Sequence, residues 1–214
     1  MLPFITFIAF DLETTGLYPA KDEIIEVAGV KFTLEKKEGK IVAKKLKEYS
    51  SFVKPNMFIP EEATRINHIT DQMVENAPPV KEVLSAFLRF CGLSTVLVAH
   101  NAGFDTEFLA KALKKNQMMI PGNPILDSLK ITKKIMVEAP SHSLENLAKK
   151  LRGELNLSLD SSNLHRALYD CEVLQEVFCA CLRKRFQDRE LTMDKALPSI
   201  EKIHGPALQI KSYC

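Results

Sequence analysis

The stretch F-I-T-F-I-A-F-D-L-E-T-T-G (residues 4–16) determines the fold class. Apolar side chains dominate both alternating sets of positions in its first half, so both faces of this predicted strand would be buried. A strand with two buried faces lies in the centre of a sheet, with other layers packed on each side. Two acids follow at Asp11 and Glu13, and Gly16 marks a turn. The stretch therefore predicts a central strand that ends in a pair of carboxylates.

Further strands are expected on either side of this centre. Strand patterns at residues 23–34 and 46–53 flank a charged hairpin end with Gly39 in its turn, and the short links favour an antiparallel meander. Strand patterns at residues 95–101 and 124–126 alternate with helices, which predicts an α/β domain with a five-stranded mixed sheet flanked by helices. Periodicity and capping residues place the helices after Pro60, at Thr70-Asp71, after Pro79, over residues 104–115, from residue 127, over residues 143–151 and over residues 164–185.

The composition excludes several classes of protein. The 214 residues are 46% hydrophobic and 26% charged, which argues against a disordered or fibrous chain, and the net charge of +2 does not indicate a nucleic-acid binder. Five cysteines without a C-x-x-C pair favour buried apolar residues in a reducing cytosol over a zinc site. The apolar start lacks a basic leader, and no stretch reaches the length of a membrane span. We expect a cytoplasmic protein without membrane association.

Asp11 and Glu13 are the first candidate site residues. They lie two positions apart on the predicted strand, so both carboxylates share one face at its carboxyl end, where open α/β sheets place their sites. Two anions at this spacing repel each other unless one is protonated or a cation lies between them. The alternative is a solvated turn after a strand, and the pair alone leaves both interpretations equally open.

Asp105 and Asp170 are acids on helix faces that otherwise carry apolar side chains. Asp105 shares its face with Leu109, and Asp170 shares its face with Leu174. A buried carboxylate without a partner is costly or becomes protonated, and a bound metal ion removes that cost. For Asp105 the alternative is a favourable position in the helix dipole, and for Asp170 it is an ion pair with an arginine or lysine.

His165 is the candidate general base. It precedes Asp170 by five residues, which is about 140° of rotation in a helix, so the two side chains would not share a face. We expect His165 at the helix start, after a cap region at residues 161–163, where it could reach sideways to the acids and exchange protons near neutral pH. A lone histidine is more often structural, so this role depends on the neighbouring acids. Oxygen ligands favour Mg²⁺ or Mn²⁺ and suit two-metal phosphoryl chemistry.

Three motifs occur in order: F-D-L-E-T-T-G-L, H-N-A-G-F-D-T-E-F-L and H-R-A-L-Y-D. Together they resemble the exonuclease motifs of the DEDDh family of 3′→5′ exonucleases, which includes the proofreading ε subunit of bacterial DNA polymerase III and RNase T. The resemblance covers residues 4–182, with support from I-N-H-I-T, I-L-D-S-L and H-S-L-E-N-L-A. It implies a ribonuclease H-like exonuclease domain over residues 1–185 and leaves residues 186–214 as a C-terminal extension of unknown role.

The resemblance also implies a role for each acid and for the histidine. Asp11 resembles the ligand that bridges two divalent ions, Mg²⁺ or Mn²⁺. Glu13 and Asp170 would complete the ion on the side of the nucleophile, and Asp105 would hold the second ion through water. His165 would deprotonate the attacking water.

The same resemblance implies how the 3′-terminal nucleotide would bind. Backbone amides near Thr14 and Thr15 would contact its sugar, Leu17 would lie against its base, and Phe104 would form an apolar wall beside it. The product would be a nucleoside 5′-monophosphate. His68 departs from the family pattern, because many relatives carry glycine at this position.

We therefore expect a metal-dependent exonuclease that acts on nucleic acid 3′ ends, with DNA favoured because the T-T-G form resembles the DNA-directed members. It would act in proofreading or repair, either with a DNA polymerase or as a homodimer. One alternative is an RNA-trimming exoribonuclease with the same site, since contacts to the 2′-hydroxyl cannot be read from the sequence. Another is a catalytically silent, polymerase-tethered nucleic-acid-binding module. The complete set of acids argues against that module, which has no need for mutually repelling carboxylates.

Overall fold

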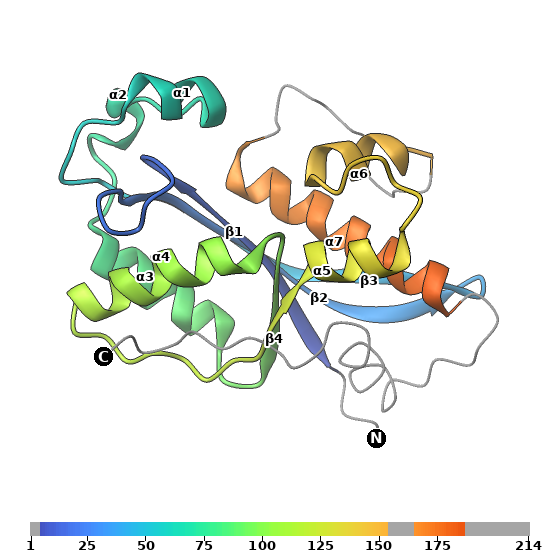
Figure 1. Ribbon diagram of the computed structural model, residues 1–214. Coiled ribbons are helices and arrows are strands. Elements are labelled where there is room, and N and C mark those ends of the chain that lie inside the picture. Colours follow the sequence, from blue (N-terminus) through green and yellow to red (C-terminus); the bar gives the residue numbers. More distant parts are fainter. Residues whose placement is uncertain (1–4, 154–164, 187–214) are drawn as a thin grey trace.

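The computed structural model describes residues 5–153 and 165–186 (Figure 1). In this part of the chain, five strands form one mixed sheet in the order β3-β2-β1-β4-β5, with β1 antiparallel to β2 and parallel to β4. The predicted five-stranded mixed sheet with β1 at its centre is therefore confirmed. The strands are β1 (Thr6–Thr14), β2 (Ile24–Lys37), β3 (Lys40–Phe52), β4 (Thr95–Ala99) and β5 (Ile125–Asp127).

Helices cover both faces of the sheet (Figure 1). Helices α5, α6 and α7 share a core with one face, and α3 and α4 share a core with the other. Among the described residues, no helix combines the length and the apolar character needed to cross a membrane. The helices are α1 (Glu61–Asn67), α2 (Asp71–Val74), α3 (Val80–Cys91), α4 (Ala102–Lys115), α5 (Ser128–Ile135), α6 (Leu144–Lys150) and α7 (Ala167–Arg185).

The alternation of side chains along β1 divides them between the two cores. Phe7 points to the α7 side, where its ring centroid lies 5.5 Å from that of Phe178. Phe10 points to the opposite side, where its ring centroid lies 6.1 Å from that of Phe87 in α3. Because Asp11 continues the face of Phe7, the chain directs this acid towards α7 and away from the α3–α4 layer.

The β2–β3 hairpin is longer than the sequence indicated. The charged residues 35–45 were expected to form an exposed hairpin end, yet the strands run to Lys37 and start again at Lys40, so that only Glu38 and Gly39 remain as the turn. The reason is that Leu34 and Ile41 are buried in the core beneath α7, which keeps the strand pairing in place despite the surrounding charges.

Other boundaries differ by a few residues. The fourth strand ends at Ala99, and α4 begins at Ala102 because Asn101 adopts a left-handed conformation with φ 65°. Helix α7 begins at Ala167. Ser143 caps α6 as expected, since its hydroxyl accepts the Asn146 N–H at 3.4 Å. The sequence also predicts a polar loop at residues 152–163. Residues 154–163 of this loop, including the expected cap at residues 161–163, and residues 187–214 of the predicted extension lie outside the described residues.

His68 ends helix α1 in a left-handed conformation, with φ 57° and ψ 19°. Its backbone N–H donates to the Thr64 carbonyl at 2.9 Å, which closes the helix end. Glycine takes this conformation without steric cost, whereas a side chain at Cβ makes it less favourable. This backbone conformation explains why the family pattern would place glycine at this position.

Replacing His68 with valine should lower the free energy of unfolding by about 1–2 kcal/mol, because a β-branched residue is strained in the left-handed region. His68→Gly is the matched control, since it removes the same exposed side chain and permits the same backbone. Denaturant unfolding of the three proteins measures both effects. Equal stability of the valine and glycine variants would contradict this account of the helix end.

Candidate metal centre

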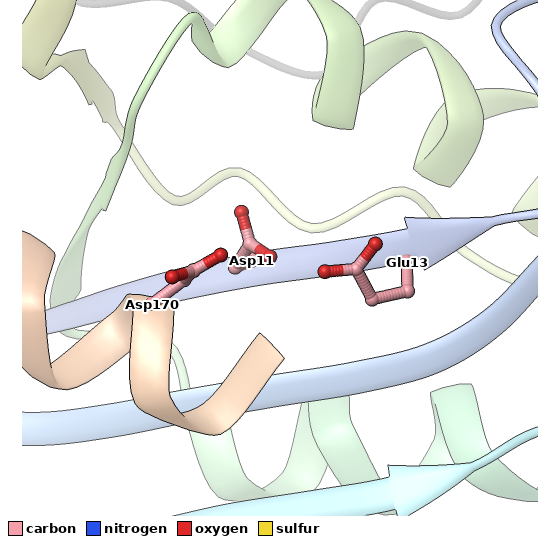
Figure 2. Close-up of side chains that lie close together, drawn as sticks. All are labelled: Asp11, Glu13 and Asp170. Atoms are coloured by element: carbon pink, nitrogen blue, oxygen red, sulfur yellow. The ribbon is translucent and has the colours of Figure 1, made fainter. Parts of the chain in front are cut away.

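Three carboxylates meet between β1 and α7. Asp11, Glu13 and Asp170 each offer one oxygen, and these oxygens all lie within 4.8 Å of one another. Figure 2 shows Asp11 and Glu13 on the strand and Asp170 facing them from the helix. The arrangement follows from strand alternation, which directs both β1 acids towards α7, together with the position of Asp170 in the first turn of that helix.

Asp170 shows why this cluster suits a cation. Its Oδ2 accepts the backbone N–H of His165 at 3.1 Å, while its buried Oδ1 has no hydrogen-bond partner among the described residues. A buried carboxylate oxygen without a partner is costly, and neighbouring carboxylates cannot supply the missing donor unless they are protonated. A divalent cation between the three acids would satisfy all of them, and an all-oxygen ligand set fits Mg²⁺ or Mn²⁺.

Asp105 belongs to the same electrostatic group but stands apart in space. It lies in the first turn of α4 with only 3% of its surface exposed, and the close group of ligand oxygens does not include it. Backbone hydrogen bonds from Leu12 and from Asp105 itself lower its pKa, although burial outweighs them. The structure thus brings three of the four predicted acids into direct proximity and places the fourth further away.

Burial and nearby negative charges raise the pKa of every acid in this group. Burial is the largest cause in each case, and it raises the pKa of Glu13 to about 9, that of Asp105 to about 8 and that of Asp170 to about 7. The pKa of Asp11 is raised well above its ordinary value by burial and then by Asp105, Glu13, Asp170 and Glu26. Without a cation, these acids therefore retain protons near neutral pH, and a bound cation would take the place of those protons.

Glu26 is a buried acid beside this group that the sequence analysis did not single out. It lies opposite Glu13 in the β1–β2 pairing and is 2% exposed. Arg166 donates to both of its carboxylate oxygens, at 3.4 and 3.3 Å, and Ala167 donates its backbone N–H at 3.2 Å. Two features of the sequence could have indicated this ion pair: an acid within the apolar run I-I-E-V-A, and the arginine that follows His165.

His165 immediately precedes α7, close to the position expected for it. It is exposed and adopts a left-handed backbone conformation with φ 62°. Its N–H donates to Asp170, so the residue expected to act as a base is tied by its backbone to one of the clustered acids.

The turn after β1 carries the residues expected to bind a terminal nucleotide. The Thr15 backbone N–H donates to the Glu23 carbonyl at 2.9 Å, which ties this residue to the chain just before β2. The Thr14 hydroxyl donates to the Gly16 carbonyl at 2.6 Å, which stabilises the turn. Leu17 is 71% exposed, which leaves its side chain accessible.

Asn67 and Asp22 hold this turn from outside, and neither was predicted as a site residue. The Asn67 side-chain amide donates to the Thr14 carbonyl at 3.3 Å, and the Asp22 carboxylate accepts the Tyr18 N–H at 2.8 Å. A Cβ at Gly16 would lie 2.5 Å from the Asp22 carboxylate, so a larger residue there would displace the Asp22 side chain. In the sequence, Asn67 is a polar residue of the quoted I-N-H-I-T motif. Its importance becomes clear only from the structure, where its side chain is buried.

Phe104 lies in the first turn of α4, one residue before Asp105. Its side chain is half-buried, and its ring centroid lies 4.9 Å from that of Phe108 in a tilted arrangement. The second ring supports Phe104 from within the helix, so that Phe104 has a fixed position beside the acids.

Comparison with known proteins adds independent information. Residues 8–178 match the RNase_T family model, described as an exonuclease. The chain is 38% identical over 173 residues to the DNA polymerase III PolC-type of Thermotoga petrophila, and 36% identical over 167 residues to that of Oceanobacillus iheyensis. These matches cover 81% and 78% of this chain but only 12% and 11% of the relatives, so the chain spans about a tenth of their length.

A solved structure described as exonuclease X in complex with 5′ overhanging duplex DNA has the same fold. It aligns with a TM-score of 0.65 at 24% identity, and the alignment covers 93% of this chain and 99% of the other. The ribonuclease H-like fold class expected from the sequence is therefore confirmed.

The raised pKa values predict how stability depends on pH in the absence of metal. Because the folded-state pKa values of about 7 to 9 exceed the ordinary values near 4, the folded protein binds more protons than the unfolded chain between these limits. Stability should therefore fall as pH rises from about 5 to 9. Melting temperatures measured in chelator across this range test the effect, and a flat profile would contradict it.

Asp11→Asn removes one anion from the group and should make this decline shallower in the metal-free protein. Millimolar Mg²⁺ or Mn²⁺ should raise the melting temperature of the wild type most strongly at high pH, where the acids have lost their protons. Asp71→Asn serves as a control, because Asp71 is an acid of α2 outside the cluster.

Proposed function

Because this chain belongs to the RNase_T family of exonucleases, we propose that it removes nucleotides one at a time from the 3′ ends of DNA in a reaction that requires divalent metal ions. The observation that carries the proposal is the meeting of Asp11, Glu13 and Asp170, with a buried oxygen of Asp170 left without a protein partner. A set of acids in this state favours cation binding over a purely structural role.

The acids would divide the binding of two ions, Mg²⁺ or Mn²⁺, between them. When bound, such ions supply water activation and neutralise charge on the phosphate. Asp11, Glu13 and Asp170 would hold these ions, because their oxygens lie within 4.8 Å of one another, with Asp11 as the ligand that both ions share. Asp105 stands apart from the three close oxygens, which suits a contact through water.

His165 would accept the proton of the attacking water. Its exposed position leaves the imidazole accessible, and its backbone bond to Asp170 keeps it beside the clustered acids. Hydrolysis would break the bond between the terminal phosphorus and the 3′ oxygen of the preceding nucleotide, and would release a nucleoside 5′-monophosphate.

The terminal nucleotide would bind at the turn after β1. The exposed Leu17 side chain offers an apolar surface for its base, and Phe104, supported by Phe108, offers a second. Thr14 and Thr15 would contribute by shaping the turn, because the Thr15 amide is already bonded to Glu23.

DNA is favoured over RNA by the relatives. Those with the quoted identities are named as DNA polymerases, which supports a proofreading or repair role and a polymerase as partner. This chain covers only about a tenth of the length of these relatives, so we propose the association with a polymerase and do not take it from the comparison. An exoribonuclease would use the same acids, and comparing DNA with RNA as the substrate distinguishes the two activities.

The purified chain should shorten 5′-labelled single-stranded DNA in a ladder from the 3′ end with Mg²⁺ or Mn²⁺, and should do nothing in chelator. Asp11→Ala should abolish the ladder, because it removes the central ligand. Parallel reactions with RNA and with mismatched duplex DNA define the substrate. Faster digestion of RNA would replace the DNA assignment, and a lack of digestion of all substrates would favour the silent binding module.

His165→Ala should reduce the rate of cleavage by about 10²–10⁴-fold, which is typical for loss of a general base. Metal binding measured by calorimetry should remain close to that of the wild type, because the ligand carboxylates are retained. His68→Ala is the matched control, since His68 is also exposed and left-handed but lies at the C-terminal end of α1. Full activity of His165→Ala would show that another group accepts the proton.

A further inference from the structure

The segment that enters α7 is tied down at both ends by carboxylates. His165 donates its backbone N–H to Asp170 at 3.1 Å, and Ala167 donates its backbone N–H to Glu26 at 3.2 Å. Between them, Arg166 donates from Nε and from one terminal nitrogen to the two oxygens of Glu26, at 3.4 and 3.3 Å. Three consecutive residues are thus fixed by one clustered acid and one acid of β2.

Arg166 has a further contact that restricts it. Its guanidinium carbon lies 5.1 Å from the ring centroid of Phe52, at the end of β3. The side chain is therefore held between an aromatic ring and a carboxylate, each from a different strand. Only a planar group with several donors meets both requirements, and lysine has neither the plane nor the paired donors.

The ion pair is buried on one side, since the Glu26 side chain is 3% exposed and that of Arg166 is 37% exposed. Removing a carboxylate from water is costly, so a buried pair gives little net stability compared with apolar residues of the same size. Such a pair can instead fix one particular geometry. Here that geometry lies opposite Glu13, beside the acid cluster.

The backbone of His165 needs such support. A residue other than glycine is strained at φ 62°, so the surrounding contacts must hold it in this conformation. The bonds to Asp170 and Glu26 act on the two sides of this residue. Loss of the Arg166 side chain leaves Glu26 an uncompensated buried anion that can reorient, and the Ala167 contact changes with it.

We propose that Arg166, held by Glu26, is a positioning residue that fixes the backbone of His165 and thereby the direction in which its imidazole faces the acid cluster. This inference depends on the proposed role of His165 as the base. In this role Arg166 acts through His165, and its charge in addition lowers the pKa of Glu13.

A double-mutant cycle tests this dependence. Arg166→Met keeps an unbranched side chain but loses both donors and the charge over the Phe52 ring. It should lower kcat by about 10²-fold, as expected for a misplaced catalytic group, with little change in KM. Arg166→Lys should recover only a small part of that loss. In a His165→Ala background, Arg166→Met should have no further effect. A full additional loss in that background would overturn the proposal.

Arg183→Met is the matched control, because Arg183 lies at the opposite end of α7 and donates to the Ile41 carbonyl at 3.0 Å. Its loss should lower stability while kcat stays unchanged. Equal falls in kcat for the two arginine variants would mean that any damage to α7 is sufficient, which also overturns the proposal.

A spectroscopic measurement separates this inference from the proposed function. The ring signals of His165, assigned by comparison with His165→Ala, should show one environment in the wild type and an averaged one in Arg166→Met. Unchanged ring signals would disprove positioning whether or not the protein cleaves nucleic acid. A wild type that cleaves no substrate would refute the proposed function, and the ring signals would still report whether Arg166 orients His165.

Discussion

Electrostatic repulsion among buried carboxylates is the constraint on which this structure depends. β1 and α7 could bury apolar side chains at the place where they meet, as they do along the rest of their contact, where Phe7 packs against Phe178. Instead, Asp11 and Glu13 from the strand face Asp170 from the helix, and Asp105 adds its charge from α4. The sheet has a helical layer on each side. This packing holds the acids together despite their repulsion, so that a cation could bind between them.

The fold was largely predictable because its signals are local. A strand with two apolar faces has to lie in the centre of a sheet, and three short-linked strands favour a meander, as β1, β2 and β3 confirm. The extent of the β2–β3 hairpin was not predictable, because the burial of Leu34 and Ile41 depends on α7, which lies more than a hundred residues further along the chain. The charged residues around Leu34 and Ile41 obscured the strand pattern in the sequence, although tertiary packing stabilises the strands there.

The site shows the same division between local and distant information. Alternation and helical periodicity indicated the faces on which Asp11, Glu13 and Asp170 lie, and the family resemblance joined them into one predicted site. They could not reveal Glu26 or Asn67, because an isolated acid or amide in a motif acquires meaning only through its partner. The partners of Glu26 lie 140 residues away, and Asn67 bonds to Thr14 across 53 residues. The hydrogen bond of the Thr15 amide was not predictable for a related reason, since its acceptor, Glu23, lies eight residues further along the chain, just before β2.

The hydrogen bond from the Asn67 side-chain amide to the Thr14 carbonyl connects the C-terminal end of α1 to the end of β1 and the turn that follows it. Asn67 also accepts the Ile69 N–H at 3.0 Å, so the end of the helix and its exit are fixed by the same side chain. A force on the exposed surface of α1, whether from a bound strand or from a neighbouring protein, would therefore be transmitted directly to the residues that follow Glu13. Contact at a distance from the acids would in this way be coupled to the geometry of the cleavage site.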